Sequence, residues 1–121
     1  MTTVTKLTDF ERYASTPEQH IVRKLVSDII ATGAGIRVYD GAYNGGDFVT
    51  HDPVTNAEAV LALLASTDGD TLHVHGADGG HIGWTVLVWG NDTAVISDYT
   101  DNAATNALVA GANNLADELE G

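Results

Sequence analysis

The sequence contains no cysteine, only two prolines and no long apolar run. The lack of cysteine excludes disulfide bonds, thiolate metal sites and cysteine nucleophiles. No stretch approaches the roughly 20 apolar residues that a membrane-spanning helix needs. The N-terminal residues also lack the apolar core of a secretory signal. We therefore expect a soluble protein that works inside a cell, with no membrane partner.

Basic residues are scarce and unevenly placed. Five Lys and Arg stand against 17 Asp and Glu, which gives a net charge of -12, and residues 38–121 contain neither Lys nor Arg. Direct binding of nucleic acid needs clustered Lys and Arg, so we expect none. An acidic surface can attract a basic partner protein. Many of the aspartates, however, stand where turns and helix ends favour Asp, which favours a role in solubility.

Helical signals occur in four segments. The clearest is 17–32, where apolar residues recur at helical spacing. Thr16 is the expected N-cap of this helix, with Gln19 as its capping-box partner and Gly33 as its stop. The other helices are expected over 8–14, over 56–66, and from Asp101 or Asn102 towards the C-terminus.

Strand signals are segments in which apolar and polar residues alternate. They occur over 35–41, 48–51, 71–75, 81–91 and 94–100. In the third of these, His73 and His75 are expected to point outward. The fourth segment, 81–91, has large apolar side chains on both of its faces, with Leu87 and Trp89 on the second face. A covered central strand or a subunit interface explains that pattern, so we predict a homo-oligomer.

The order of these elements predicts the fold class. Short connections at 76–81 and 90–93 make the last three strands antiparallel neighbours. We predict a two-layer α+β fold, with a mostly antiparallel sheet of four to five strands packed by three main helices. A length of 121 residues with 44% hydrophobic residues fits a single domain over residues 1–121.

Metal binding and catalysis are weakly supported by the sequence. Two imidazoles at i and i+2, His73 and His75, hold a metal only when further ligands converge, and no third ligand stands at a telling spacing. The Gly-rich turns 44–47 and 77–80 match no phosphate-loop pattern. There is no GxSxG motif, although Ser97 and Asp98 close a strand. We therefore predict no metal, no cofactor and no catalytic residue.

Aromatic residues, by contrast, gather with Asp and His on strands and at strand ends. Such a set suits a flat heterocycle joined to a sugar, because rings stack on the base and polar groups hold the hydroxyls. Arg37 is the cation best placed for a phosphate group. The predicted ligand-binding residues are Arg37, Tyr39, Asp40, His73, His75, Trp84, Asp98 and Tyr99.

Four stretches carry a resemblance to a known group of proteins: VYDG, STDGDTLHV, LVWGNDTAVISDYTDN and ANNLADELE. Across residues 36–119 the chain resembles small proteins of unknown function from phages and prophages of high-GC bacteria. The resemblance implies an accessory protein made during infection, in the host cytoplasm, for which blocking a host process is a common role.

Three functional hypotheses follow. The favoured one is a non-catalytic accessory protein, of counter-defence type, that binds and sequesters a small polar, nucleotide-like ligand. The alternative is an acidic protein–protein inhibitor that masks a basic surface of a host protein. The third is a small hydrolase that depends on the histidines.

Overall fold

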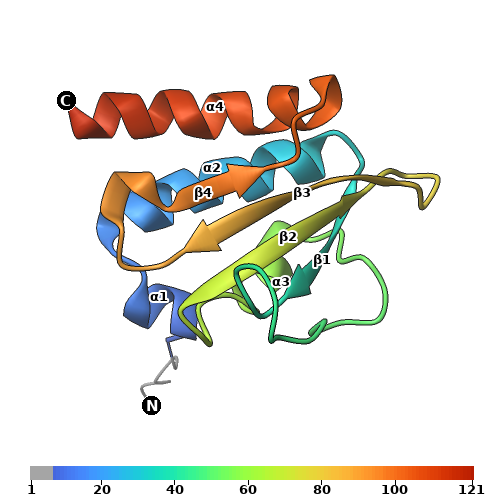
Figure 1. Cartoon of the computed structure of the whole chain (residues 1–121), viewed down its shortest axis with the longest axis horizontal. Helices are drawn as coiled ribbons and strands as arrows, with labels where there is room; N and C mark the ends of the chain where they lie inside the picture. Colours follow the sequence, from blue (N-terminus) through green and yellow to red (C-terminus); the bar gives the residue numbers. More distant parts are fainter. Residues whose placement is uncertain (1–6) are drawn as a thin grey trace, which may run out of the picture.

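The computed structural model describes residues 7–121 (Figure 1). Residues 1–6, the first part of the segment in which we expect no secretory signal, lie outside the described residues. The chain forms an α+β fold, as predicted. Its elements in order are α1 (Asp9–Tyr13), α2 (Thr16–Ala31), β1 (Gly35–Tyr39), α3 (Ala57–Leu61), β2 (Gly69–His75), β3 (His81–Val88), the 3-10 turn η1 (Asp92–Ala94), β4 (Ile96–Tyr99) and α4 (Ala103–Glu120).

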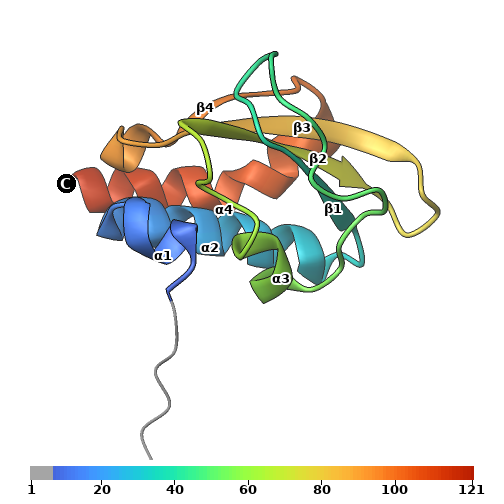
Figure 2. The ribbon, with the colours of Figure 1, turned by 90° about the horizontal axis from the view of Figure 1, so that it is seen from below.

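The four strands form one antiparallel sheet in the order β1-β2-β3-β4. Figure 2 shows the two long helices, α2 and α4, side by side beneath the same face of this sheet. The two-layer arrangement is therefore confirmed, but two long helices and two short ones replace the three main helices that we predicted. No helix within residues 7–121 combines the length and the apolar character needed to cross a membrane.

The hydrophobic core lies between the helices and the sheet. Fully buried residues of α2 follow the predicted helical stripe, and those of β1 and β2 follow the predicted alternation. The alternation turns Ile36 and Val38 towards the helices, which leaves Arg37 and Tyr39 on the other face. The core side chains from these three elements are Ile21, Val22, Leu25, Val26, Ile29, Ile36, Val38, Leu72 and Val74.

The second face of 81–91 lies inside the fold. Leu87 is 0% exposed in the core, and Trp89 packs edge-on against Phe10 with ring centroids 5.9 Å apart. The Trp89 indole N–H donates to Asp70 Oδ2 at 2.8 Å. The core of one chain thus accounts for the apolar surface from which we predicted a homo-oligomer, and the oligomeric state stays a prediction.

Two predicted strands differ in the structure. Residues 48–51 form no strand, because Phe48 makes only an isolated bridge to Tyr39 and the next bridge to β1 comes at Val54, opposite Ile36. The last strand is shortened to Ile96–Tyr99, because residues 92–94 coil into η1 after Gly90 and Asp92 take positive φ angles of 88° and 50°.

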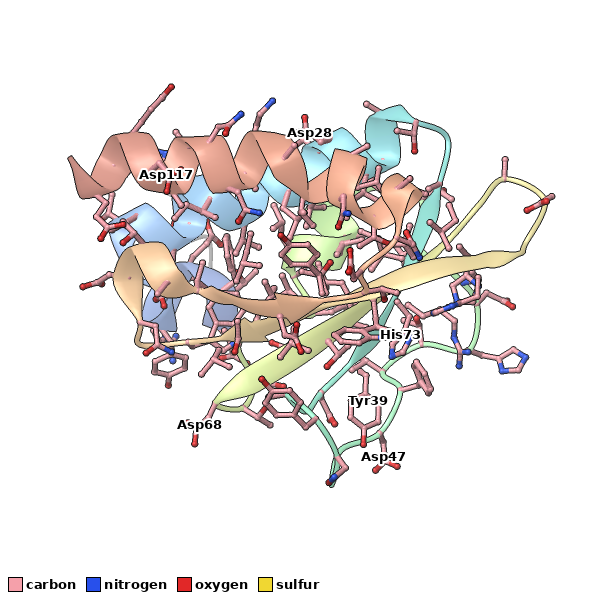
Figure 3. All side chains as sticks on the ribbon, turned by 45° about the horizontal axis from the view of Figure 1, so that its top comes forward. Asp28, Tyr39, Asp47, Asp68, His73 and Asp117 are labelled. Carbon is pink, nitrogen blue, oxygen red and sulfur yellow. The ribbon has the colours of Figure 1, made fainter. Side chains whose placement is uncertain are left out.

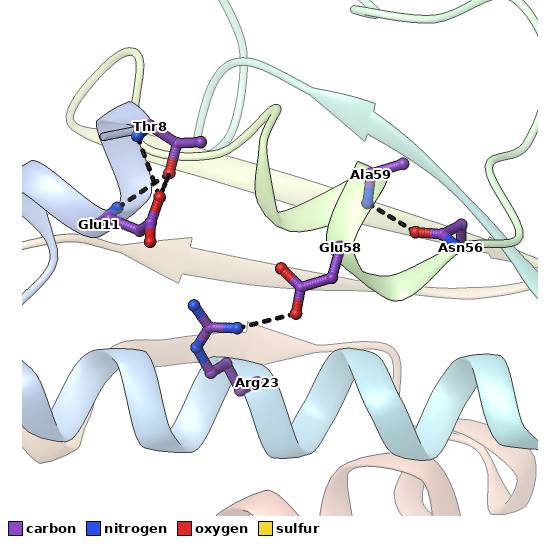
Figure 4. A network of polar contacts seen from close by, with 6 residues as sticks. All are labelled: Thr8, Glu11, Arg23, Asn56, Glu58 and Ala59. Carbon is purple, nitrogen blue, oxygen red and sulfur yellow. Dashed lines mark hydrogen bonds and ion pairs between the residues drawn. The ribbon is translucent and has the colours of Figure 1, made fainter. Parts of the chain in front are cut away.

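The helix predicted over 56–66 is confined to α3. Asn56 caps it by accepting from Ala59 N at 3.0 Å, and Arg23 of α2 pairs with Glu58 at 3.1 Å (Figure 4). The helix ends early because Ala65 takes a φ of 64° and donates its N–H to the buried Asp70 at 2.9 Å. A long-range hydrogen bond therefore overrides the local helical signal.

The start of α2 is fixed by a buried carboxylate. Ser15 is the N-cap, one residue before the predicted Thr16, and Glu18 takes the place of Gln19 in the capping box. Glu18 is 0% exposed. Its Oε1 accepts from Ser15 N at 2.8 Å, and its Oε2 accepts from the backbone N–H groups of residues 90 and 91 at 2.8 and 3.0 Å. One side chain thus ties the helix to the turn after β3.

Replacing Glu18 with Gln should lower the free energy of unfolding by about 2–3 kcal/mol, because an amide NH2 then faces backbone donors in a buried site. Urea denaturation measures this change. Glu11→Gln is the matched control, since Glu11 completes the same capping box with Thr8 on the exposed helix α1 (Figure 4). Its loss should be much smaller, and equal losses in the two variants would contradict the anchoring role of Glu18.

Candidate ligand-binding site

The sheet face turned away from α2 and α4, which we call the open face, is overlain by the loop 40–56 (Figure 2). Register places residues of neighbouring strands side by side on it: Arg37 is opposite His73, and His73 is opposite Trp84. Figure 3 shows Tyr39 and His73 projecting together from the sheet, away from the helices. The open face therefore carries polar and aromatic side chains rather than a second core.

A pocket of about 410 Å³ lies between the open face and the loop. This volume falls within the range typical of small-molecule sites. Most of its lining is aromatic or apolar, with a hydroxyl and an imidazole added. The lining residues are Tyr39, Ala42, Tyr43, Phe48, Thr71, His73, Trp84 and Val86.

Hydrogen bonds hold the loop over the pocket. The Tyr39 hydroxyl accepts from Gly46 N at 2.9 Å, and Asp40 Oδ1 accepts from Asp47 N at 2.7 Å. The Thr71 hydroxyl lies 2.8 and 2.9 Å from the carbonyl oxygens of residues 41 and 42. A Cβ on Gly46 would lie 2.6 Å from Asp40 Oδ1, so this close approach requires glycine. The loop is thus tied to β1 and β2.

Aromatic rings form one wall of the pocket. Phe48 packs against Tyr39 with centroids 5.5 Å apart and against His73 at 5.2 Å. Tyr43 is 65% exposed, and its hydroxyl lies 3.1 Å from Ser97 Oγ of β4. The loop therefore reaches from the β1 edge of the sheet to the β4 edge, with the pocket beneath it.

Three imidazoles meet beside the pocket. His73 Nδ1 lies 3.1 Å from His81 Nε2, and the His75 ring is 5.3 Å from the His81 ring. Burial lowers the pKa of His73, and His81, His75 and Arg37 lower it further. Burial and His75 likewise lower the pKa of His81. The cluster brings together His73 and His75, two of the predicted ligand-binding residues, and His81, which was not among them.

The described residues offer little for metal chemistry or nucleophilic catalysis. Within residues 7–121, no three His, Asp or Glu side chains are grouped in a way that could hold a metal ion. The Ser97 hydroxyl bonds to Tyr43, and Asp98 Oδ1 accepts from the N–H of Tyr99. Neither Ser97 nor Asp98 therefore forms a hydrogen bond with a histidine among the described residues.

The predicted ligand-binding residues fall into three groups. Tyr39, His73 and Trp84 line the pocket, and Arg37 and His75 lie beside it on the open face. Two others are not part of the lining: Asp98 is opposite the lining residue Val86 in the register and so lies next to the pocket on the open face, and Asp40 bonds to the loop backbone. Tyr99 packs against the core instead.

The predicted ligand-binding residues did not include the pocket-lining residues Ala42, Phe48, Thr71 and Val86, nor Tyr43, which the sequence analysis grouped only with the other aromatic residues. Strand alternation could have added Thr71 and Val86, since each shares a strand face with a predicted residue. The loop residues have no periodicity from which their position could be predicted. Only the path of the loop back across the open face brings them to the pocket.

Comparisons of the chain with protein-family models, with curated proteins and with solved structures found no match. The interpretation of the pocket therefore depends on the geometry and chemistry of its own residues.

The lowered pKa values of His73 and His81 should make the protein less stable in mild acid. The unfolded chain binds protons near the ordinary histidine pKa of about 6.5, whereas the folded cluster binds them only at lower pH. The free energy of unfolding contributed by these groups therefore falls as the pH drops through about 6.5. Urea denaturation between pH 7.5 and 5.5 measures this fall, and His73→Asn should reduce it.

His20→Asn is the control for this measurement, because His20 lies on α2 and outside the cluster. It should leave the pH dependence attributed to the cluster in place. A wild-type stability that stays flat or rises as the pH falls through 6.5, with no difference from His73→Asn, would contradict the prediction.

Proposed function

We propose that the protein binds and sequesters a small polar ligand with a flat, nucleotide-like ring in the pocket between the open face and the loop 40–56. The observation that carries this proposal is the aromatic lining of a ligand-sized hollow, contributed by Tyr39, Tyr43, Phe48 and Trp84. Rings of this kind give a planar ligand stacking and edge contacts without demanding one particular base.

Polar groups at the pocket supply contacts for the rest of such a ligand. The Thr71 hydroxyl and the His73 imidazole belong to the lining, and the Tyr43 and Ser97 hydroxyls meet at one end. A pocket with a largely apolar wall and a few fixed polar groups is typical of small-molecule sites. Because the loop is already hydrogen-bonded in place, binding needs little ordering of the chain.

The placement of the carboxylates favours this proposal over the acidic inhibitor. Glu18 and Asp70 are buried, and Asp40, Asp78 and Asp98 each accept a backbone N–H close to their own turn or strand. These side chains serve the fold, through local or long-range hydrogen bonds, rather than forming a row on one face. An acidic inhibitor of a basic host surface stays the alternative, and a histidine-dependent hydrolase comes third.

The biological setting is part of the same proposal. A small accessory protein of phage type, made in the host cytoplasm, can block a host process by removing a small signalling molecule from solution. Sequestration needs binding and no turnover, which fits a pocket without an assembled nucleophile or metal group among residues 7–121. Oligomeric state is not required for this role.

A panel of nucleosides and nucleotides should raise the melting temperature, and calorimetry should give the affinity. Tyr43→Ala and Trp84→Ala should each weaken binding about tenfold, because each removes a ring worth about 1–3 kcal/mol of stacking. Tyr13→Ala is the matched control: Tyr13 is 62% exposed, close to the 65% of Tyr43, but lies on α1 away from the pocket.

Salt dependence separates the two leading functions. Ligand binding through ring contacts should survive high salt, whereas a complex with a basic host protein should weaken steeply as salt rises. If no member of the panel shifts the melting temperature, or if Tyr13→Ala weakens binding as much as Tyr43→Ala, the proposal fails.

A further inference from the structure

We infer that Arg37, His73 and His81 form an anion subsite at one end of the pocket, so that the ligand carries a phosphate group beside its ring. This inference rests on the proposed function and names the chemical class of its ligand. It depends on a contrast within the chain: the sequence has 17 acidic residues and five basic ones, yet among residues 7–121 no carboxylate forms a salt bridge with Arg37, His73 or His81.

Arg37 is the first part of the subsite. Its guanidinium carbon lies 3.9 Å from the centroid of the Phe48 ring, so the ring fixes its position. Its Nε is buried and has no hydrogen-bond partner among the described residues. Arg23 and Lys24 each pair with a carboxylate, and Arg12 is exposed to water. Arg37 is thus a half-buried cation that no carboxylate pairs with among the described residues.

The hydrogen-bonded histidine pair is the second part. In the neutral pair, one ring donates an N–H hydrogen bond to the other across the 3.1 Å contact between His73 Nδ1 and His81 Nε2. The accepting ring then carries the one N–H that points outward. Uptake of one proton gives the pair two outward N–H donors and a positive charge. A phosphate accepts from such donors with charge-assisted hydrogen bonds. The pair therefore becomes an anion clamp by binding a proton.

The surroundings of the pair favour an anion as the missing partner. His73 is faced by Arg37 from β1, by His75 on its own strand, by His81 from β3 and by the uncharged Phe48 of the loop. Every charged group that acts on His73 is cationic or becomes so on protonation, and His75 is the one that acts on His81. A bound phosphate relieves this repulsion and stabilises the protonated pair.

The subsite is continuous with the aromatic pocket. His73 and Phe48 both line the pocket. His73 also contacts His81, and Phe48 also contacts Arg37. A ligand whose ring lies against Tyr39, Phe48 and Trp84 therefore places a substituent at the imidazole pair. Nucleoside monophosphates have this construction, and nucleosides lack the anionic part.

Calorimetry at pH 7 with the four common ribonucleosides, their 5′-monophosphates and inorganic phosphate tests this inference. At least one monophosphate should bind about tenfold or more tightly than its nucleoside. Arg37→Gln should remove that difference, and Arg37→Lys should restore part of it. Arg12→Gln is the matched control and should change neither affinity. Circular dichroism confirms that each variant is folded.

NMR titration of the histidine ring signals adds a readout that a purely structural role would not move. The signals of His73 and His81 are assigned with His73→Asn and His81→Asn. Their pKa values should rise when the monophosphate binds and stay unchanged when the nucleoside binds, because only the anion stabilises the protonated pair.

The outcomes separate the subsite from the pocket. Equal affinities for nucleosides and monophosphates would overturn the subsite and leave the proposed function standing. Monophosphates that bind no more tightly than inorganic phosphate, with Arg37→Gln abolishing both, would support the subsite and overturn the aromatic pocket. Binding of none of these probes would overturn both.

Discussion

Both long helices pack against one face of a four-stranded sheet, and this one-sided packing decides where a ligand can bind. The apolar stripe of α2 packs against the inward residues of the strands, so the core forms without side chains of the open face. Two buried carboxylates keep this layer in place. Glu18 joins α2 to the turn after β3, and Asp70 joins the end of α3 to Trp89. Because the open face does not pack against the helices, it can carry histidine, arginine and tyrosine.

The long loop 40–56 turns this exposed face into a pocket. Long loops without helix or strand are uncommon in small domains and often functional. This one is attached at several points: to Tyr39 and Asp40 at the end of β1, to Thr71 on β2 and to Ser97 on β4. Phe48 adds ring contacts with Tyr39, His73 and Arg37. Together these attachments place Tyr43 and Phe48 at the pocket.

Parts of the structure that depend on local periodicity could be predicted from the sequence. Alternation placed Arg37, Tyr39 and His73 on one face, and helical spacing gave the buried stripe of α2. Elements shaped by distant contacts could not be predicted. Bulk on both faces of β3 did not distinguish a subunit interface from a core, and the structure places Leu87 in the core. The helix at 57 stops early because Ala65 bonds to Asp70, and His81 meets His73 through a register shift after Val74. The loop side chains carry no periodic signal, so two of the aromatic pocket residues could not be placed.

The net charge and the local charge act at different distances, and this difference bears on which anions the open face can accept. A net charge of -12 repels a long polyanion, which would meet the acidic surface over its whole length. At physiological ionic strength, the charges of the distant carboxylates are largely screened beyond about 8 Å. A single phosphate at the proposed subsite would therefore respond mainly to its immediate neighbours, and among the described residues no carboxylate pairs with Arg37, His73 or His81. The proposed subsite thus favours a small phosphorylated molecule over nucleic acid.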